Sequence, residues 1–227
     1  ISTAPLEIIY SGSADLERVK QALAAAFATL PREEVRVIST AAPHVCRESV
    51  QHVEDVLDVT QGKLGMGFSC GSDDMPALLM GNTLFGGSSN SKLFLNVREK
   101  LSLCYYASSL YHRQKGLITV SSGIEFQNYQ RAYDEIMAQL EAVQKGELED
   151  WELEGARSTL LNSYATVGDS QGKLENFYLG QAATGQHETP ADLARAIQDM
   201  TAERICRAMS TVKLDTVYFL KGKEAEA

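Results

Sequence analysis

Residues 85–100, FGGSSNSKLFLNVREK, run from a loop of small residues into an amphipathic segment. Apolar side chains recur in this segment at three- and four-residue spacing, which predicts a helix with one buried stripe. The predicted stripe consists of Leu93, Phe94, Val97 and Leu101. A glycine-rich loop that opens a helix can cradle a phosphate, so the first question is whether this loop does.

The loop lacks the spacing of a phosphate-binding site. That site needs Gly-x-x-x-x-Gly-Lys followed by Ser or Thr, placed between a strand and a helix. Residues 86–92, GGSSNSK, do not fit, and residues 75–84 before them have the pattern of a helix. The sequence therefore argues against nucleotide binding.

Strand patterns flank this segment on both sides. Residues 64–70 alternate large and small side chains, as a strand with one buried face does, and the valine-rich residues 50–59 precede a turn at Gln61-Gly62. These two stretches predict a hairpin. Residues 103–111 and 117–124 predict a second hairpin.

The ends of the chain add one strand each, with helices between. Residues 6–10 predict a short strand, followed by a turn and a helix that Pro31 ends. A last strand is predicted at residues 216–220. Helices are predicted at residues 127–144, 150–165, 172–185, 190–199 and 202–209. Because hairpins imply antiparallel pairing, we expect an α+β fold, one antiparallel sheet covered by helices.

Composition indicates a globular protein and argues against some partners. The net charge of −9 has the wrong sign for nucleic acid or an anionic membrane surface, so we expect neither partner. No apolar run approaches the length of a membrane-spanning helix. The cysteines show no Cys-x-x-Cys spacing, and we expect reduced core thiols in a cytoplasmic protein. They are Cys46, Cys70, Cys104 and Cys206.

Catalytic motifs are missing. The chain has no His-x-x-Glu-His zinc motif and no Gly-x-Ser-x-Gly nucleophile elbow. His44, Glu48 and His52 are spaced four apart, but the surrounding β-branched valines favour surface histidines on a strand. Cys104 lies in an apolar strand pattern and is expected in the core.

Four segments together carry a family resemblance: residues 61–68 (QGKLGMGF), 84–94 (LFGGSSNSKLF), 97–105 (VREKLSLCY) and 151–157 (WELEGAR). In order and spacing they resemble the second half of the pitrilysin/insulinase-type metallopeptidases, which include mitochondrial processing peptidase. The resemblance implies that the loop and helix are architectural. Lys92, Ser102 and Cys104 depart from the residues common in that family.

The resemblance also implies a function. Members consist of two similar halves that enclose a chamber, with zinc ligands on the first half only. It therefore implies no cofactor in this chain, zinc if at all on a missing first half, and substrate-backbone contacts by Arg98 and Tyr105. The alternative is that Arg98 pairs with a nearby acid and Tyr105 is a packed strand residue.

We therefore expect residues 1–227 to form a single half-domain that supplies one wall of a peptide-binding chamber and is inactive alone. Its expected partners are a peptide or unfolded protein substrate and a zinc-bearing or similar first half, or an oligomer. The alternative function is that of a noncatalytic member that binds or scaffolds a peptide or protein. Whether the parent protein is an enzyme stays open.

Overall fold

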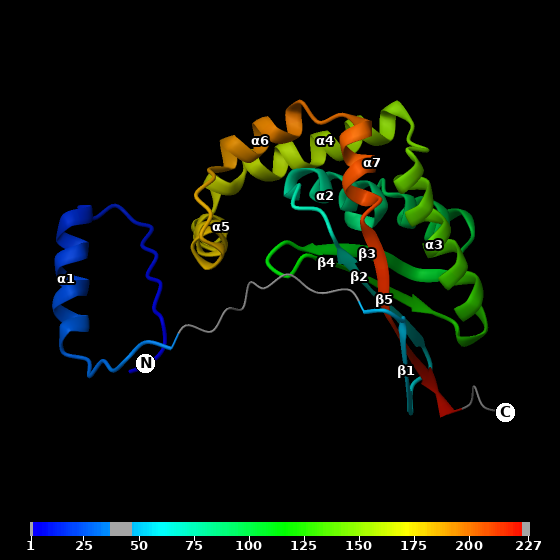
Figure 1. Ribbon diagram of the computed structural model, residues 1–227, viewed down its shortest axis with the longest axis horizontal. Helices are drawn as coiled ribbons and strands as arrows, with labels where there is room; N and C mark the ends of the chain where they lie inside the picture. Colours follow the sequence, from blue (N-terminus) through cyan, green and yellow to red (C-terminus); the bar gives the residue numbers. More distant parts are fainter. Residues whose placement is uncertain (1, 37–46, 224–227) are drawn as a thin grey trace.

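The computed structural model describes residues 2–36 and 47–223 of the 227-residue chain. Residues 47–223, which we call the body, contain a five-stranded sheet of order β1-β5-β2-β4-β3 with helices on one face (Figure 1). Its strands are β1 (Gln51–Leu57), β2 (Gly62–Cys70), β3 (Cys104–His112), β4 (Leu117–Ile124) and β5 (Val212–Gly222). The predicted α+β class is confirmed, although β1 pairs with β5 in parallel.

One of the two predicted hairpins is confirmed. β3 and β4 are antiparallel neighbours, as expected. The hairpin predicted for residues 50–59 and 64–70 is wrong, because β5 lies between β1 and β2 and pairs with both. Local sequence shows that two stretches are strands, but it does not show that a strand from the far end of the chain inserts between them.

The helices of the body cover one face of the sheet (Figure 1). They are α2 (Met75–Asn82), α3 (Tyr129–Lys145), α4 (Asp150–Ala165), α5 (Gln171–Thr184), α6 (Pro190–Gln198) and α7 (Ala202–Met209). Short 3₁₀ turns, η3 (Phe126–Asn128) and η4 (Val167–Asp169), precede α3 and α5. The helices predicted from residue 127 onward are therefore confirmed. Among the described residues, no helix combines the length and apolar character that crossing a membrane requires.

The two glycines of the loop end a π-helical segment, η1 (Thr83–Gly87), and a second π-helical segment, η2 (Leu93–Lys100), follows the loop. Leu93 and Val97 of η2 are fully buried, as predicted. Phe94 is only half-buried and Leu101 is 38% exposed, so these two members of the predicted stripe are wrong. A π-helix has more residues per turn than an α-helix, so a stripe drawn at α-helical spacing does not stay on one face of η2.

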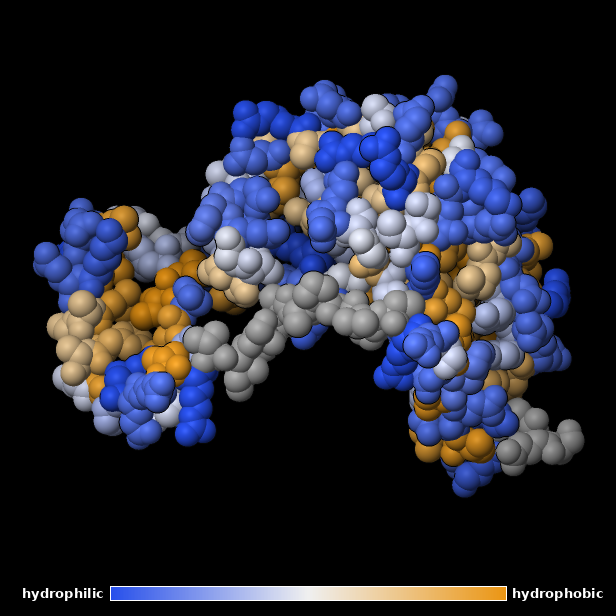
Figure 2. Space-filling view, in the orientation of Figure 1, coloured by the Kyte–Doolittle hydropathy of each residue, from blue (hydrophilic) through white to orange (hydrophobic). Residues whose placement is uncertain are grey.

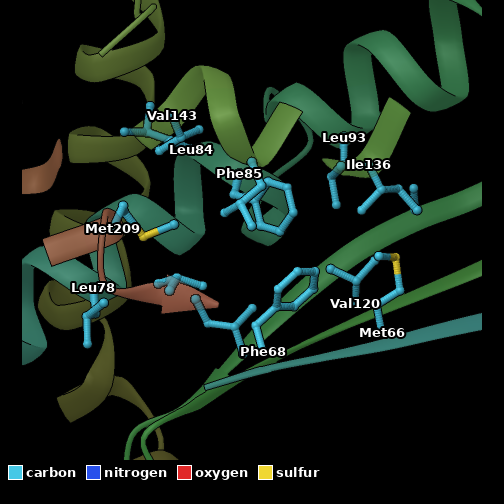
Figure 3. Packing of buried hydrophobic residues seen from close by; sticks show 14 of the residues in the cluster. Met66, Phe68, Leu78, Leu84, Phe85, Leu93, Val120, Ile136, Val143 and Met209 are labelled. Carbon is cyan, nitrogen blue, oxygen red and sulfur yellow. The ribbon is translucent and has the colours of Figure 1, made fainter. Parts of the chain in front are cut away.

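The core lies between the sheet and its helices. Leu64, Met66 and Phe68 of β2 are buried, which confirms the alternation of that strand. The ring of Phe68 meets the ring of Phe85 edge-on, with centroids 6.2 Å apart (Figure 3). Phe85 of η1 and Leu93 and Val97 of η2 belong to the same apolar cluster as the buried residues of β2, so the segments before and after the loop both pack on the sheet.

A buried ion pair joins the loop to α4. The Lys92 ammonium donates to both carboxylate oxygens of Glu152, at 3.0 Å each, and the two side chains are only 10% and 6% exposed. Glu152 also accepts from the backbone N–H of Glu149 and so caps the start of α4. One carboxylate therefore fixes both the helix start and the lysine of the loop.

Two arginines form hydrogen bonds between other helices that cover the sheet. Arg157 of α4 donates to the carbonyls of Ile197, Gln198 and Met200, which satisfies the end of α6. The Arg204 guanidinium of α7 forms two bonds, of 2.7 and 2.9 Å, to the Asp74 carboxylate that caps α2. These hydrogen bonds lower the pKa of Asp74 below its ordinary value of 3.8.

Residues 2–36, which we call the N-terminal unit, lie apart from the sheet and its helices (Figure 1). The predicted helix is confirmed as α1 (Leu16–Ala28). The strand predicted at residues 6–10 is wrong, because a strand needs a hydrogen-bonded neighbour and no backbone hydrogen bond joins these residues to another described residue. Whether residues 1–227 act as a single half-domain stays a prediction.

We predict that Lys92→Met lowers the free energy of unfolding by about 3–5 kcal/mol, because it leaves the Glu152 carboxylate buried and unpaired. The measurement is urea denaturation followed by circular dichroism. The control is Lys92→Met combined with Glu152→Gln, which removes both charges and keeps an acceptor for the cap of α4. Equal losses in the single and double variants would contradict the prediction.

The Asp74–Arg204 pair predicts a pH-dependent contribution to stability. Because the folded pKa of Asp74 lies below its unfolded value, the pair stabilises the fold above about pH 4 and ceases to do so as pH falls through the folded pKa. Asp74→Asn keeps the helix cap, so we expect it to lower the free energy of unfolding at pH 7 by up to about 1 kcal/mol.

The measurement is urea denaturation of both proteins, from pH 7 down to the lowest pH at which they remain folded. The difference between Asp74→Asn and the unaltered chain should shrink with falling pH. A difference that stays constant over that range would show that the ion pair does not contribute.

Candidate functional site

The two glycines of the loop allow it to lie against the edge strand β3. A Cβ added at Gly86 would lie 2.7 Å from the backbone nitrogen of Ser109, and one at Gly87 would lie 2.9 Å from the Asn82 amide nitrogen. The Ser109 hydroxyl in turn donates to the Asn82 side-chain oxygen at 2.7 Å. The loop is therefore packed against protein on this side, as an architectural loop should be.

The end of η2 turns the chain directly into β3. The N–H of Leu101 donates to the carbonyl of Asn96, and that of Leu103 donates to the carbonyl of Val97. Between them Ser102 has a φ of 50°, in the left-handed region that glycine favours. This tight reversal sets Arg98, near the end of the helix, beside Tyr105, near the start of the strand.

Three contacts hold the Arg98 guanidinium. Its Nε donates to the backbone carbonyl of Tyr105 at 3.0 Å, and one Nη lies 3.2 Å from the Glu99 carboxylate. Its central carbon lies 4.7 Å from the centre of the Phe94 ring, within the range of a cation–π contact. Arg98 thus does pair with a nearby acid, as the alternative interpretation expected.

Tyr105 does not fit that alternative. Its side chain is 61% exposed, so it is not a packed strand residue. The structure therefore brings Arg98 and Tyr105 together, with a fixed guanidinium next to an exposed phenol.

Two cavities meet at this pair, and we call them together the β3 groove. One, of about 390 Å³, lies beside the end of η2 and includes Ser102, Cys104 and Glu125 in its lining. The other, of about 440 Å³, lies between loop residues 86–89 and strand residues 105–109. Arg98 and Tyr105 line both cavities. The groove therefore follows the edge of the sheet, because β3 ends the strand order.

The thiol in the groove is not an activated nucleophile. Burial raises the pKa of Cys104 and outweighs the opposing influence of Arg98. Since the thiolate is the reactive form, Cys104 stays a weakly reactive thiol at neutral pH. Cys104 is half-buried rather than a full core residue, as is Cys206, whereas Cys70 is buried; all three are free. Cys46 lies outside the described residues.

Zinc does not fit the described part of the chain. No group of three or more His, Cys, Asp or Glu side chains there could hold a metal ion. His52 lies in β1 with its side chain exposed, as the sequence predicted, and Glu48 lies before that strand. His44 falls outside the described residues.

Sequence reasoning missed two parts of the site. Phe94 belongs to the predicted buried stripe, whereas in the structure its ring lies against the Arg98 guanidinium. The Asn82–Ser109 hydrogen bond behind the loop was not foreseen. An asparagine in an apolar helical stretch signals a buried hydrogen bond, because an unpaired buried amide is costly, but it does not reveal the partner.

Comparisons with known proteins agree with this architecture. The sequence pattern of the family described as "Peptidase M16 inactive domain" matches residues 4–160. "Probable inactive metalloprotease YmfF" of Bacillus subtilis is 38% identical over 226 residues, which cover 96% of this chain and 52% of that protein. The chain spans about half the length, or less, of the curated relatives that it matches.

Two solved structures have the same fold. A conserved protein from Enterococcus faecalis is 28% identical with a TM-score of 0.78, and the match covers 90% of this chain and 50% of that one. A peptidase M16 inactive domain from Pseudomonas fluorescens is 18% identical with a TM-score of 0.76, covering 92% of this chain and 52% of that one.

We predict that Gly86→Ala lowers the free energy of unfolding by about 1–3 kcal/mol, because the added methyl group overpacks the contact with Ser109. Chemical denaturation measures the change. The control is Gly172→Ala in α5, where the nearest atom to an added Cβ is 4.0 Å away, and we expect no loss there. A Gly86→Ala variant as stable as the control would show that the loop does not need this close approach.

Proposed function

We propose, from the premise that this chain belongs to the family of peptidase M16 inactive domains, that it is the zinc-free half of a metallopeptidase-like assembly. In this proposal it forms one wall of a peptide-binding chamber and contributes substrate contacts. A partner half, on the same polypeptide or on another subunit, forms the remainder. We place the assembly in the cytoplasm, in keeping with the free thiols of Cys70, Cys104 and Cys206.

The observation that carries the proposal is the position of Arg98 and Tyr105 where the two cavities of the β3 groove meet. The groove follows an edge strand, and the outer edge of such a strand offers backbone N–H and C=O groups to an extended peptide. A peptide needs no particular side chains to pair in this way. The substrate class that suits the groove is therefore an extended peptide or an unfolded segment of a protein.

Arg98 and Tyr105 have distinct roles in this proposal. The guanidinium has five N–H donors, and its contacts with Tyr105 and Glu99 leave donors for a peptide carbonyl. The exposed phenol of Tyr105 can donate to a second carbonyl. Glu99 and Glu125, which also line the groove, favour neutral or basic side chains in the bound peptide.

A second candidate function is that of a noncatalytic member, in which the assembled halves bind or scaffold a peptide or protein without cleaving it. The name of the Bacillus subtilis relative, a probable inactive metalloprotease, favours this candidate. Both candidates use the same groove and the same two residues. Because the described residues do not suit zinc, the metal ligands of the partner half decide between them.

We predict that Arg98→Ala weakens peptide binding by the assembled halves about 10- to 100-fold, since hydrogen bonds to charged groups contribute about 1.5–3 kcal/mol. Tyr105→Phe, which removes a neutral donor, should weaken it about 3- to 10-fold. Fluorescence anisotropy with a labelled, extended peptide that lacks acidic residues measures both.

The matched controls are Arg195→Ala in α6 and Tyr178→Phe in α5, two exposed residues that do not line the groove. Melting temperatures of all four variants should stay near that of the unaltered protein. Affinities that fall equally in the variants and the controls would refute the assignment, as would early unfolding of Arg98→Ala with unchanged affinity per folded molecule.

A further inference from the structure

Ser102 follows η2 in a backbone conformation that is unfavourable for most residues other than glycine. Its φ of 50° is left-handed, and the N–H of Leu103 closes the helix end by donating to the carbonyl of Val97 at 3.0 Å. Glycine is common at this position of a helix end, because a Cβ there crowds the following carbonyl oxygen. The other described residues with a positive φ are all glycines, namely Gly116, Gly146 and Gly185.

The neighbours of Ser102 hold it in this conformation. Leu103 is 3% exposed and Val97 is fully buried, and both belong to the apolar core cluster. The helix end therefore cannot unwind to relieve the strain without exposing core residues. Unfavourable backbone conformations persist where the surrounding structure imposes them, and they cluster at functional sites. A serine at this position thus needs a reason other than the turn itself.

Packing does not supply that reason. The Ser102 side chain is exposed and fills no space in the core. Its hydroxyl forms no hydrogen bond to another described residue, so it does not cap the helix end. Hydrophilic side chains cover much of the helical layer (Figure 2), so exposure alone assigns Ser102 no role. What distinguishes Ser102 is a conformation that glycine would adopt at lower cost.

Ser102 lines the cavity of about 390 Å³ in the β3 groove, which Arg98 also lines. The two carboxylates of this cavity already have partners. Glu99 pairs with the Arg98 guanidinium. Glu125 accepts from the Gln127 side chain at 3.0 Å. A guanidinium can only donate, so it suits the carbonyls of a peptide and not its N–H groups, whereas a hydroxyl can also accept.

We propose that Ser102 is a further peptide-binding residue of the β3 groove, whose hydroxyl accepts a hydrogen bond from a backbone N–H of the bound peptide. The inference rests on the proposed function, since it requires a peptide in the groove. Arg98 then binds a carbonyl and Ser102 an N–H of the same extended segment. Because both bonds go to the backbone, Ser102 strengthens binding without selecting a side chain.

The test separates the hydroxyl from the backbone conformation. Ser102→Ala removes the hydroxyl and keeps Cβ, whereas Ser102→Gly removes both. Ser102→Asn restores a polar acceptor on a residue type that tolerates the left-handed region. The matched control is Ser210→Gly, since Ser210 is exposed, lies outside the groove and has an ordinary φ of −62°.

Two measurements are made on each variant. Fluorescence anisotropy of the assembled halves, with the labelled peptide used for Arg98→Ala, gives the affinity. Thermal unfolding of the 227-residue chain gives the melting temperature.

We expect Ser102→Ala and Ser102→Gly to weaken peptide binding about 3- to 10-fold, as the loss of one neutral hydrogen bond should. Ser102→Gly should at the same time raise the melting temperature by about 2–4 °C, because it removes the strain that Ser102→Ala keeps. Ser102→Asn should bind more tightly than either variant. Ser210→Gly should bind like the unaltered chain and melt at a lower temperature.

A second set of peptides tests the assigned donor. Each peptide has one backbone amide replaced by an ester, which removes one N–H. One ester peptide should bind the unaltered assembly about 3- to 10-fold more weakly and lose nothing further with Ser102→Ala. If every ester peptide loses the same affinity in both proteins, the N–H bond assigned to Ser102 is wrong.

The remaining outcomes overturn the inference. Unchanged affinity in Ser102→Ala shows that the hydroxyl does not bind the peptide. A loss in Ser102→Gly alone assigns the effect to the stiffness of the turn. In both cases Arg98→Ala still tests the proposed function by itself, whereas an unaltered assembly that binds no peptide refutes the proposed function and this inference together.

Discussion

The buried pair of Lys92 and Glu152 constrains the rest of the candidate site. Two opposite charges withdrawn from water are tolerated only when each satisfies the other, so the end of the loop and the start of α4 must meet. Glu152 at the same time caps α4 through Glu149. The pair therefore fixes the start of η2 relative to the helical layer, and that start decides where Arg98, six residues later, emerges. A buried ion pair is weak support for stability, but it specifies geometry.

A second constraint acts from the sheet. Gly86 lies so close to Ser109 that no side chain fits between them, which brings the loop against the edge strand. With η2 fixed at one end by Lys92 and the loop held at β3, the chain has room only for the tight reversal at Ser102. The groove is thus formed by packing of the core elements. Arg98 and Tyr105 line the groove, but neither belongs to the buried core.

The sequence predicted those features that depend on neighbours in the chain. The β3–β4 hairpin and the helices after residue 127 follow from local patterns. The features that failed depend on distant partners. β5 inserts between β1 and β2 from the other end of the chain, and residues 6–10 have a strand pattern without a strand beside them. The predicted burial of Phe94 and Leu101 failed for another reason. A π-helix bonds residues five apart rather than four, and this shift of one residue leaves no clear mark in the eight residues of η2.

In the proposed assembly this chain contributes through binding by Arg98 and Tyr105. Burial raises the pKa of the Cys104 thiol beside them, which makes that thiol a weak nucleophile. Binding accelerates a reaction only when a contact is stronger in the transition state than with the bound substrate. The Arg98 guanidinium is already held by Tyr105 and Glu99, so it does not move as the substrate approaches the transition state. Its effect on the reaction rate therefore depends on where it is fixed. If it points at a carbonyl remote from the scissile bond, the loss of Arg98 raises KM alone. If it points at the carbonyl that gains charge, the same loss lowers kcat, and the ratio of these two effects reports the position of the groove in the proposed chamber.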